Sequence, residues 1–245
     1  MAIQFVGGNY TSGLGGSGTL VVSLSSLVSG VDTAARAGDF VVALAANSTG
    51  TGSATTLGVS GSDGNVYTNL SKLTVAETID PSACVAYKYL TAADASVTVW
   101  GATSTTGGKI GLVSVWRGVN SVTPLIASQS GSASGINSPL PIFAAVTPTI
   151  PGSVVLAVGT GSVSDMIQFT MGANYTRAIG AINSGARSTT SGICGAIGYR
   201  LWPGYAAETP PSWTGPTDSN AEGYIANTLV LNPSPNKSSF TTSNT

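Results

Sequence analysis

The chain contains no histidine, and this removes the commonest general base of enzymes and a frequent metal ligand. A Ser-His-Asp triad is therefore excluded, and no Gly-x-Ser-x-Gly turn of the hydrolase kind occurs. The ten acidic residues are scattered through turns rich in Gly, Ser, Thr and Asn, where a carboxylate usually caps the turn. The residue types thus predict a protein that is not an enzyme and has no catalytic residues.

Two short patterns imitate ligand sites. The segment Gly13 to Gly18 matches the dinucleotide pattern Gly-x-Gly-x-x-Gly, but it leads into the strand-like run Thr19 to Leu24 instead of a helix. We interpret it as a loop. The segment Asp218 to Glu222 places oxygen-bearing side chains at alternate positions, yet it lacks the other ligands and the glycine of a calcium loop. A polar turn is the favoured interpretation, cation binding there stays open, and no metal ion or cofactor is expected.

Aromatic residues offer the clearest candidate for binding. Trp202 and Tyr205 lie in a Pro-Gly loop pattern, and flat rings in a loop could stack on a sugar, so we predict a contact surface there. The other tryptophans, Trp100, Trp116 and Trp213, are predicted to pack in the core. The two cysteines, Cys84 and Cys194, are too few for a disulfide framework, and we expect buried free thiols.

Composition restricts the partners. Only 8% of the 245 residues are charged and the net charge is -1, so there is no basic field to hold nucleic acid or an anionic membrane. No apolar run approaches the roughly 20 residues that cross a bilayer. The start, Met1 to Phe5, lacks the basic and long apolar parts of a secretory signal, so we expect synthesis in a cytoplasm.

The elements that must position these residues are short strands. Apolar, β-branched runs alternate with clusters of Gly, Pro, Asn and Ser, and no stretch keeps a period of 3.6 residues. This pattern predicts an all-β fold, an antiparallel β-sandwich or jelly roll. The expected strands are 19–27, 40–45, 84–90, 97–100, 110–116, 153–158, 193–201 and 224–231.

A weak internal duplication runs along the chain. Five short segments recur in the same order at an offset of about 110 to 115 residues, beginning at Gly38, Gly64, Cys84, Trp100 and Gly108. We therefore expect two interleaved or face-packed halves, at about 19–120 and 140–233, joined by a proline-punctuated connection over 121–151. Residues 1–18 are predicted to form an N-terminal arm with a Gly-rich loop, residues 19–233 the sandwich, and residues 234–245 a C-terminal arm.

Three segments carry a resemblance to a known family. They are Gly38-Asp39-Phe40-Val41-Val42-Ala43, then Val85-Ala86-Tyr87-Lys88, then Val115-Trp116-Arg117-Gly118-Val119 followed by Pro124. Over roughly residues 19–233 the chain resembles a concanavalin-like or jelly-roll β-sandwich module of bacteriophage virion and tail proteins. The resemblance implies a structural protein of the virion, with capsid decoration or cementing as the first expectation. A tail or fibre component that binds host glycans as a carbohydrate-binding module is the alternative.

The surface composition also bears on assembly. A Ser-, Thr- and Gly-rich sandwich with nine basic residues has few charges to keep copies or strand edges apart. We therefore expect a homo-oligomer, a trimer for example, or a repeated lattice contact, with other virion proteins as partners. The apolar stretch Met1 to Val6 and the arm after Pro233 are the segments predicted to pair between subunits.

Overall fold

The computed structural model describes residues 2–14, 19–49, 57–75, 80–90, 96–101, 107–136, 141–162, 170–183, 192–204, 206–214 and 221–235. These ranges contain thirteen strands in three antiparallel sheets and no helix, so none that could cross a membrane. The first sheet has the order β1 (Gln4–Leu14), β8 (Gly108–Arg117), β3 (Phe40–Thr49), β6 (Asp80–Tyr89), β5 (Thr68–Thr74). The second has the order β11 (Thr176–Asn183), β12 (Ile193–Leu201), β10 (Val154–Ser162), β13 (Ala221–Leu231), β9 (Leu125–Ile136). The third is β2 (Leu20–Ser23), β7 (Ser96–Gly101), β4 (Leu57–Gly61).

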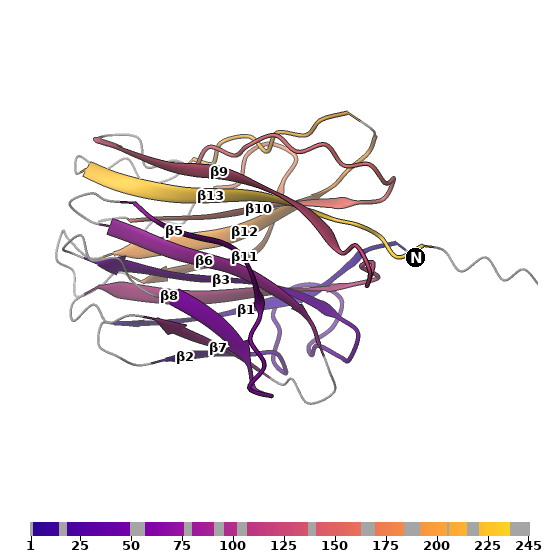
Figure 1. The fold of residues 1–245 in the computed structure, drawn as a ribbon, viewed down its shortest axis with the longest axis horizontal. Helices are drawn as coiled ribbons and strands as arrows, with labels where there is room; N and C mark the ends of the chain where they lie inside the picture. The colour runs from indigo at the N-terminus through magenta and orange to yellow at the C-terminus, as the bar shows by residue number, and fades with distance from the viewer. Residues whose placement is uncertain are drawn as a thin grey trace, which may run out of the picture.

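The two five-stranded sheets pack face to face and the small sheet covers the outer face of the first (Figure 1). Strand β3 shows why its sequence is an unbroken apolar run. Phe40, Val42 and Leu44 enter the central core between the five-stranded sheets. Val41 and Ala43 enter a second core beneath the small sheet. A strand buried on both faces needs apolar residues at every position, because successive side chains point to opposite faces.

A third core covers the outer face of the second sheet. It is formed by loop segments, which bring Phe143, Trp202 and Trp213 onto strands β10, β12 and β13. The predicted all-β antiparallel sandwich is confirmed, and Trp116 and Trp213 are core residues, each 1% exposed. The side chain of Trp100 lies outside the described part. Both cysteines are buried and neither forms a disulfide, as expected.

The two halves of the chain have corresponding strand orders. Each five-stranded sheet is built from one half, and β1, β8, β3, β6, β5 match β9, β13, β10, β12, β11 in sequence order and in pairing. The bulge between Asn69 and Ser71 in β5 has its counterpart between Arg177 and Ile179 in β11. The halves are therefore face-packed and not interleaved. The strand orders correspond, whereas the duplication itself and a jelly roll are not confirmed.

The register corrects one of the sequence matches. Tyr87 lies opposite Val42 and Tyr199 lies opposite Leu156, so the two tyrosines occupy matching places. The cysteines do not, because Cys84 faces Ala45 while Cys194 faces Gly161, two positions out of register. The Cys84–Cys194 match therefore pairs residues that are not equivalent in the two sheets.

The structure also differs from the expected boundaries. Residues 4–14, predicted as an arm and loop, form β1, which pairs with β8 of the same chain. On the other edge of β1, Gly8 pairs with Val28, and the Val6 carbonyl accepts the backbone N–H of Val31. Val6 and Gly8 thus have backbone partners on the second edge of β1 within the same chain. Pairing of Met1 to Val6 with another subunit stays a prediction. The predicted connection over 121–151 contains β9, an edge strand of the second sheet.

Candidate functional site

One end of the sandwich, here called the Arg117 end, carries the candidate site. Strands β6, β8, β12 and β13 end there and β3, β5, β10 and β11 begin there, on the side of the N-terminus in Figure 1. The loops of this end are 24–39, 62–67, 118–124, 147–153, 170–175, 202–204 with 206–214, and 232–235. Their charged side chains form three ion-pair clusters, one for each of three strand ends.

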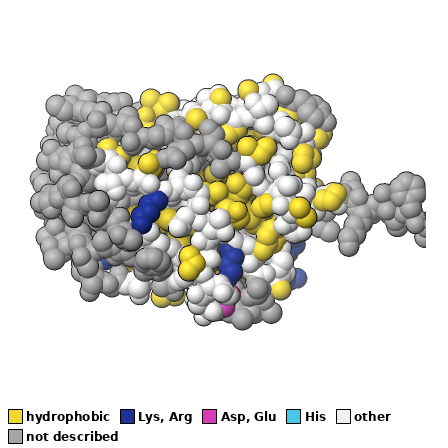
Figure 2. Space-filling model, viewed as in Figure 1, with side chains coloured by type: hydrophobic (Ala, Val, Ile, Leu, Met, Phe, Trp, Pro, Cys, Tyr) yellow, Lys and Arg dark blue, Asp and Glu magenta, His cyan; other side chains and the backbone are white. Residues whose placement is uncertain are grey.

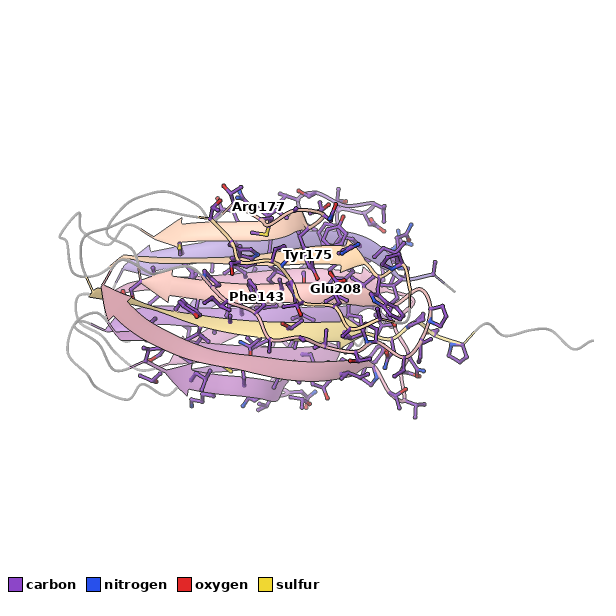
Figure 3. All side chains as sticks on the ribbon, turned by 90° about the horizontal axis from the view of Figure 1, so that it is seen from above. Phe143, Tyr175, Arg177 and Glu208 are labelled. Atoms are coloured by element: carbon purple, nitrogen blue, oxygen red, sulfur yellow. The ribbon has the colours of Figure 1, made fainter. Side chains whose placement is uncertain are left out.

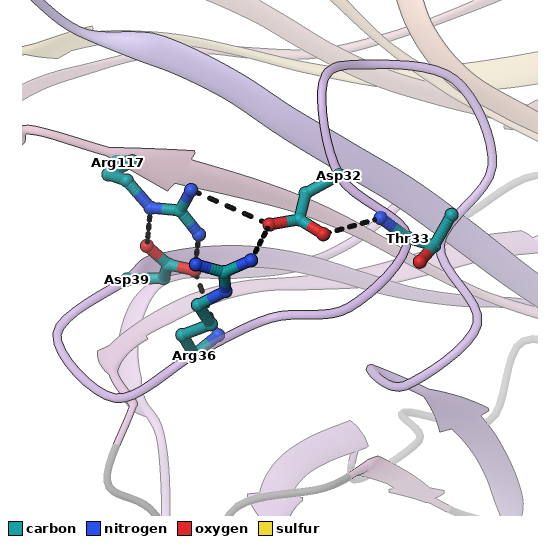
Figure 4. A network of polar contacts seen from close by, with 5 residues as sticks. All are labelled: Asp32, Thr33, Arg36, Asp39 and Arg117. Carbon is teal, nitrogen blue, oxygen red and sulfur yellow. Dashed lines mark hydrogen bonds and ion pairs between the residues drawn. The ribbon is translucent and has the colours of Figure 1, made fainter.

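The first cluster joins the loop before β3 to the end of β8 (Figure 4). The Arg117 guanidinium donates from Nε and Nη2 to the two carboxylate oxygens of Asp39, at 2.8 and 2.9 Å. Asp39 also accepts the backbone N–H of Arg36 at 2.9 Å, and it is 1% exposed. Asp32 lies 2.8 Å from Arg36 and 3.6 Å from Arg117. The hydrogen bonds to Asp39 raise the pKa of Arg117, and those from the Thr33 backbone lower the pKa of Asp32.

The second cluster fixes the turn before β5 to strand β6. Lys88 Nζ donates to both oxygens of Asp63, at 2.9 and 2.8 Å, and lies 5.6 Å from the centre of the Tyr67 ring. Asp63 also accepts from the backbone and the side chain of Asn65. The Lys88 ammonium is the main cause of an Asp63 pKa well below its usual range. The turn is therefore held by a charge-assisted contact across the sheet edge.

The third cluster belongs to the cover of the second sheet. Glu208 accepts hydrogen bonds from Arg200 Nη1 at 2.9 Å and from the Tyr175 hydroxyl at 3.2 Å. Tyr175 and Glu208 come from different loops and lie side by side in Figure 3. Burial, and the Glu208 charge after it, raise the pKa of Tyr175 well above its usual range. A neutral phenol that donates to a carboxylate ties the two loops to β12.

Hydrogen bonds hold the connection between the two halves, residues 118–124, at the same end. The Tyr89 hydroxyl donates to the Val119 carbonyl at 2.5 Å, and Ser234 N donates to the Gly118 carbonyl at 2.7 Å. Asn120 N donates to the Asn232 carbonyl at 2.8 Å. Burial raises the pKa of Tyr89 to about 12, so its hydroxyl keeps its proton. The chain after β8 and the chain after β13 are thus bound to each other.

Between these anchors, aliphatic side chains face solvent. Val122 is 85% exposed, and Val28, Val31, Val66 and Leu201 are further large exposed hydrophobic residues at this end. Figure 2 shows hydrophobic side chains gathered toward the same end of the molecule. The same end has a groove of about 360 Å³, lined by Ala2, Ile150, Pro151, Gly152, Pro233, Ser234 and Pro235. This end therefore presents apolar side chains on segments that ion pairs and hydrogen bonds hold in place.

Of the two residues predicted to bind, the structure describes Trp202, and its side chain is not at the surface. Trp202 is 4% exposed and its indole N–H donates to the Ala206 carbonyl at 3.2 Å, so its ring packs in the third core. Tyr205 lies outside the described residues. The same holds for Asp218, and of Glu222 only the backbone is described, as part of β13. Cation binding by that loop stays untested.

The described residues contain no group of three or more His, Cys, Asp or Glu side chains placed to share a metal ion. What the arrangement does is mechanical: each cluster uses a strand residue to fix a loop. Sequence reasoning missed these clusters, since Asp39 and Arg117 are 78 positions apart and only the β3–β8 pairing joins them.

Comparisons with protein-family models, with curated proteins and with solved structures find no match to this chain.

Proposed function

We propose that the protein is a structural component of a bacteriophage particle that docks on the protein shell through its Arg117 end. The observation that carries the proposal is the set of exposed aliphatic side chains at this end, on segments that ion pairs and hydrogen bonds hold in place. Preorganised apolar contacts bind a partner protein at a smaller entropic cost than mobile loops do. The resemblance to virion modules favours a phage shell as that partner, and capsid decoration or cementing as the role.

The packing of the fold and the low charge of the chain support the same role. Three stacked cores give a stiff body, and few charges oppose close packing of many copies on a lattice. The alternative, a tail or fibre module that binds host glycans, loses its main aromatic candidate because Trp202 is packed inside the protein. It remains an outcome that the experiments below distinguish.

The first experiment is mass spectrometry of particles purified by density gradient. We expect the chain in the particle band at a fixed ratio to the major shell protein. Its absence from intact particles would overturn the proposal. A selective signal for the isolated protein on a glycan array would support the glycan-binding alternative instead.

The second experiment tests the docking surface. Val122→Asp and Val66→Asp should each weaken binding to particles stripped of the chain by about tenfold, since a valine buried at an interface contributes about 1.5 kcal/mol. Val21→Asp is the matched control, because Val21 is 56% exposed but lies on β2 of the small sheet. Equal binding of all three variants would exclude the Arg117 end as the docking surface.

A further inference from the structure

A buried lysine and a buried asparagine lie opposite each other in the first sheet. Lys109 of β8 pairs in register with Asn47 of β3. Lys109 is 7% exposed and Asn47 is 1% exposed. Lysine is almost never buried to this extent unless its charge is paired or removed, because taking the charge out of water is costly.

The two side chains share one face of the sheet. Side chains at every second position of a strand point the same way. The residues of β3 and β8 that alternate in step with Asn47 and Lys109 pack in the core beneath the small sheet: Val41, Ala43, Ala45, Val113 and Val115. Directly opposite residues of an antiparallel pair have Cβ atoms about 4.5–5.5 Å apart, which a lysine side chain spans easily. The Lys109 amine and the Asn47 carboxamide are therefore within reach of each other.

The fold does not need this pair at this place. Phe40 opposite Trp116 in the first sheet corresponds to Val154 opposite Leu231 in the second. Seven residues further along, Asn47 and Lys109 correspond to Gly161 and Tyr224, which are also paired in register. The second sheet thus accommodates an uncharged pair at the matching position. Among the described strands, a buried amine opposite a carboxamide is therefore particular to the first sheet, and the shared strand pairing does not require it.

We propose that Lys109 and Asn47 form an intramolecular isopeptide bond. In this step the neutral amine Nζ attacks Cγ of Asn47, the Nζ–Cγ bond forms and the Cγ–Nδ2 bond breaks. The proton that Nζ loses passes to the departing nitrogen, which leaves as ammonia, so neither an oxidant nor a co-reactant is required. The product replaces a buried cation with a neutral amide, which removes the desolvation penalty of the charge.

The surroundings favour the step in two ways. Burial lowers the pKa of Lys109 and so increases the fraction of the nucleophilic neutral amine. The strand register holds amine and amide together, which converts an otherwise very slow encounter into a proximity-driven reaction. The bond would join two adjacent strands and close the chain between residues 47 and 109. A covalent closure of this length stabilises the folded state mainly by restricting the unfolded chain.

Intact mass spectrometry of the full purified chain tests the proposal. We expect a mass lower than that of the sequence by one ammonia, and a digest that contains the Asn47 and Lys109 segments joined in one branched peptide. The branched peptide separates this reaction from succinimide formation at an asparagine, which also releases ammonia. A folded chain with the unmodified mass, or ammonia loss without the branched peptide, would overturn it.

Variants make the test specific. Lys109→Arg and the double variant Asn47→Gly with Lys109→Tyr, which copies the pair of the second sheet, should both keep the full mass of their sequences. Lys72→Arg, on the exposed part of β5, should still lose ammonia. Asn47→Asp should lose water instead of ammonia, because hydroxide then takes the place of the leaving amide nitrogen. Ammonia loss that persists in the double variant would exclude Lys109 and Asn47 as its source.

Discussion

At the scale of single residues, the Asp63–Lys88 pair makes stability depend on acid. Lys88 holds the folded-state pKa of Asp63 below its unfolded value of 3.8. A carboxyl group of this kind stabilises the fold above its unfolded pKa, and the contribution is lost as the pH falls through the folded pKa. The unfolding midpoint in urea should therefore fall between pH 5 and strongly acid conditions.

Asp63→Asn isolates this contribution. The variant should be less stable than the wild type at neutral pH, and the difference between the two should shrink as the pH is lowered below about 4. Urea titrations at several pH values measure it. A difference that is the same at pH 7 and at pH 2 would show that the charge of Asp63 is not what stabilises the turn.

The sequence alone predicted the position of some single residues and not of others. Buried thiols at Cys84 and Cys194 and core positions for Trp116 and Trp213 followed from the sequence. Trp202 did not, because a Pro-Gly context indicates a loop but does not say whether that loop covers a sheet. Ion pairs between distant residues could be found only once the strand register was known.

At the scale of elements, the Arg117 and Arg36 side chains both pair with Asp32, but only Arg117 also pairs with Asp39. Arg117→Ala leaves Asp39 with a buried charge and without its bidentate partner, and should destabilise the fold by about 2–3 kcal/mol. The Arg36 side chain is 68% exposed, so Arg36→Ala should cost less than about 1 kcal/mol. Denaturant unfolding compares the two variants, and equal effects would contradict a special role for the Asp39 contact.

The loop 24–39, which lies along the edge of β1, contains two glycines whose substitution can be compared. Gly30 has φ +91°, and a Cβ there would overlap the Val6 carbonyl, while Gly38 has a similar φ of +86° and open space around it. Gly38→Ala should cost about 1 kcal/mol for the left-handed backbone alone, and Gly30→Ala about 2 kcal/mol more. Thermal unfolding would show the difference. Similar midpoints for both variants would mean that the loop does not lie tightly on β1.

Strand prediction succeeded where burial on both faces leaves an apolar run, as in β3, β8 and β13. It failed for β9, whose residues are mostly Ser, Gly and Ala and show no apolar alternation. It failed for most of β1 for a similar reason, since Gly, Asn, Thr and Ser interrupt the pattern. Both are edge strands of five-stranded sheets, and a neighbouring strand supplies the hydrogen bonds that their own sequences do not indicate.

At the scale of the whole molecule, the central core belongs to both halves. β1 packs on β11 and β5 packs on β9, so each sheet buries the other's inner face. A fragment of residues 1–120 should therefore bind a hydrophobic dye and aggregate, whereas co-expression with residues 121–245 should restore a soluble complex. A fragment that is monomeric and fails to bind the dye would show that the first half does not need the second.

The chain passes from the first five-stranded sheet to the second at residues 118–124, so the ribosome completes the first sheet before it begins the second. All strands of the first sheet have been synthesised once β8 is complete, yet the partner of its inner face has still to be made. Because chains are made at about 5–20 residues per second, the apolar inner face of the first sheet stays uncovered for several seconds while the second sheet is synthesised. During this interval the nascent chain is a natural client for chaperones, and slow codons in the second half would prolong its exposure.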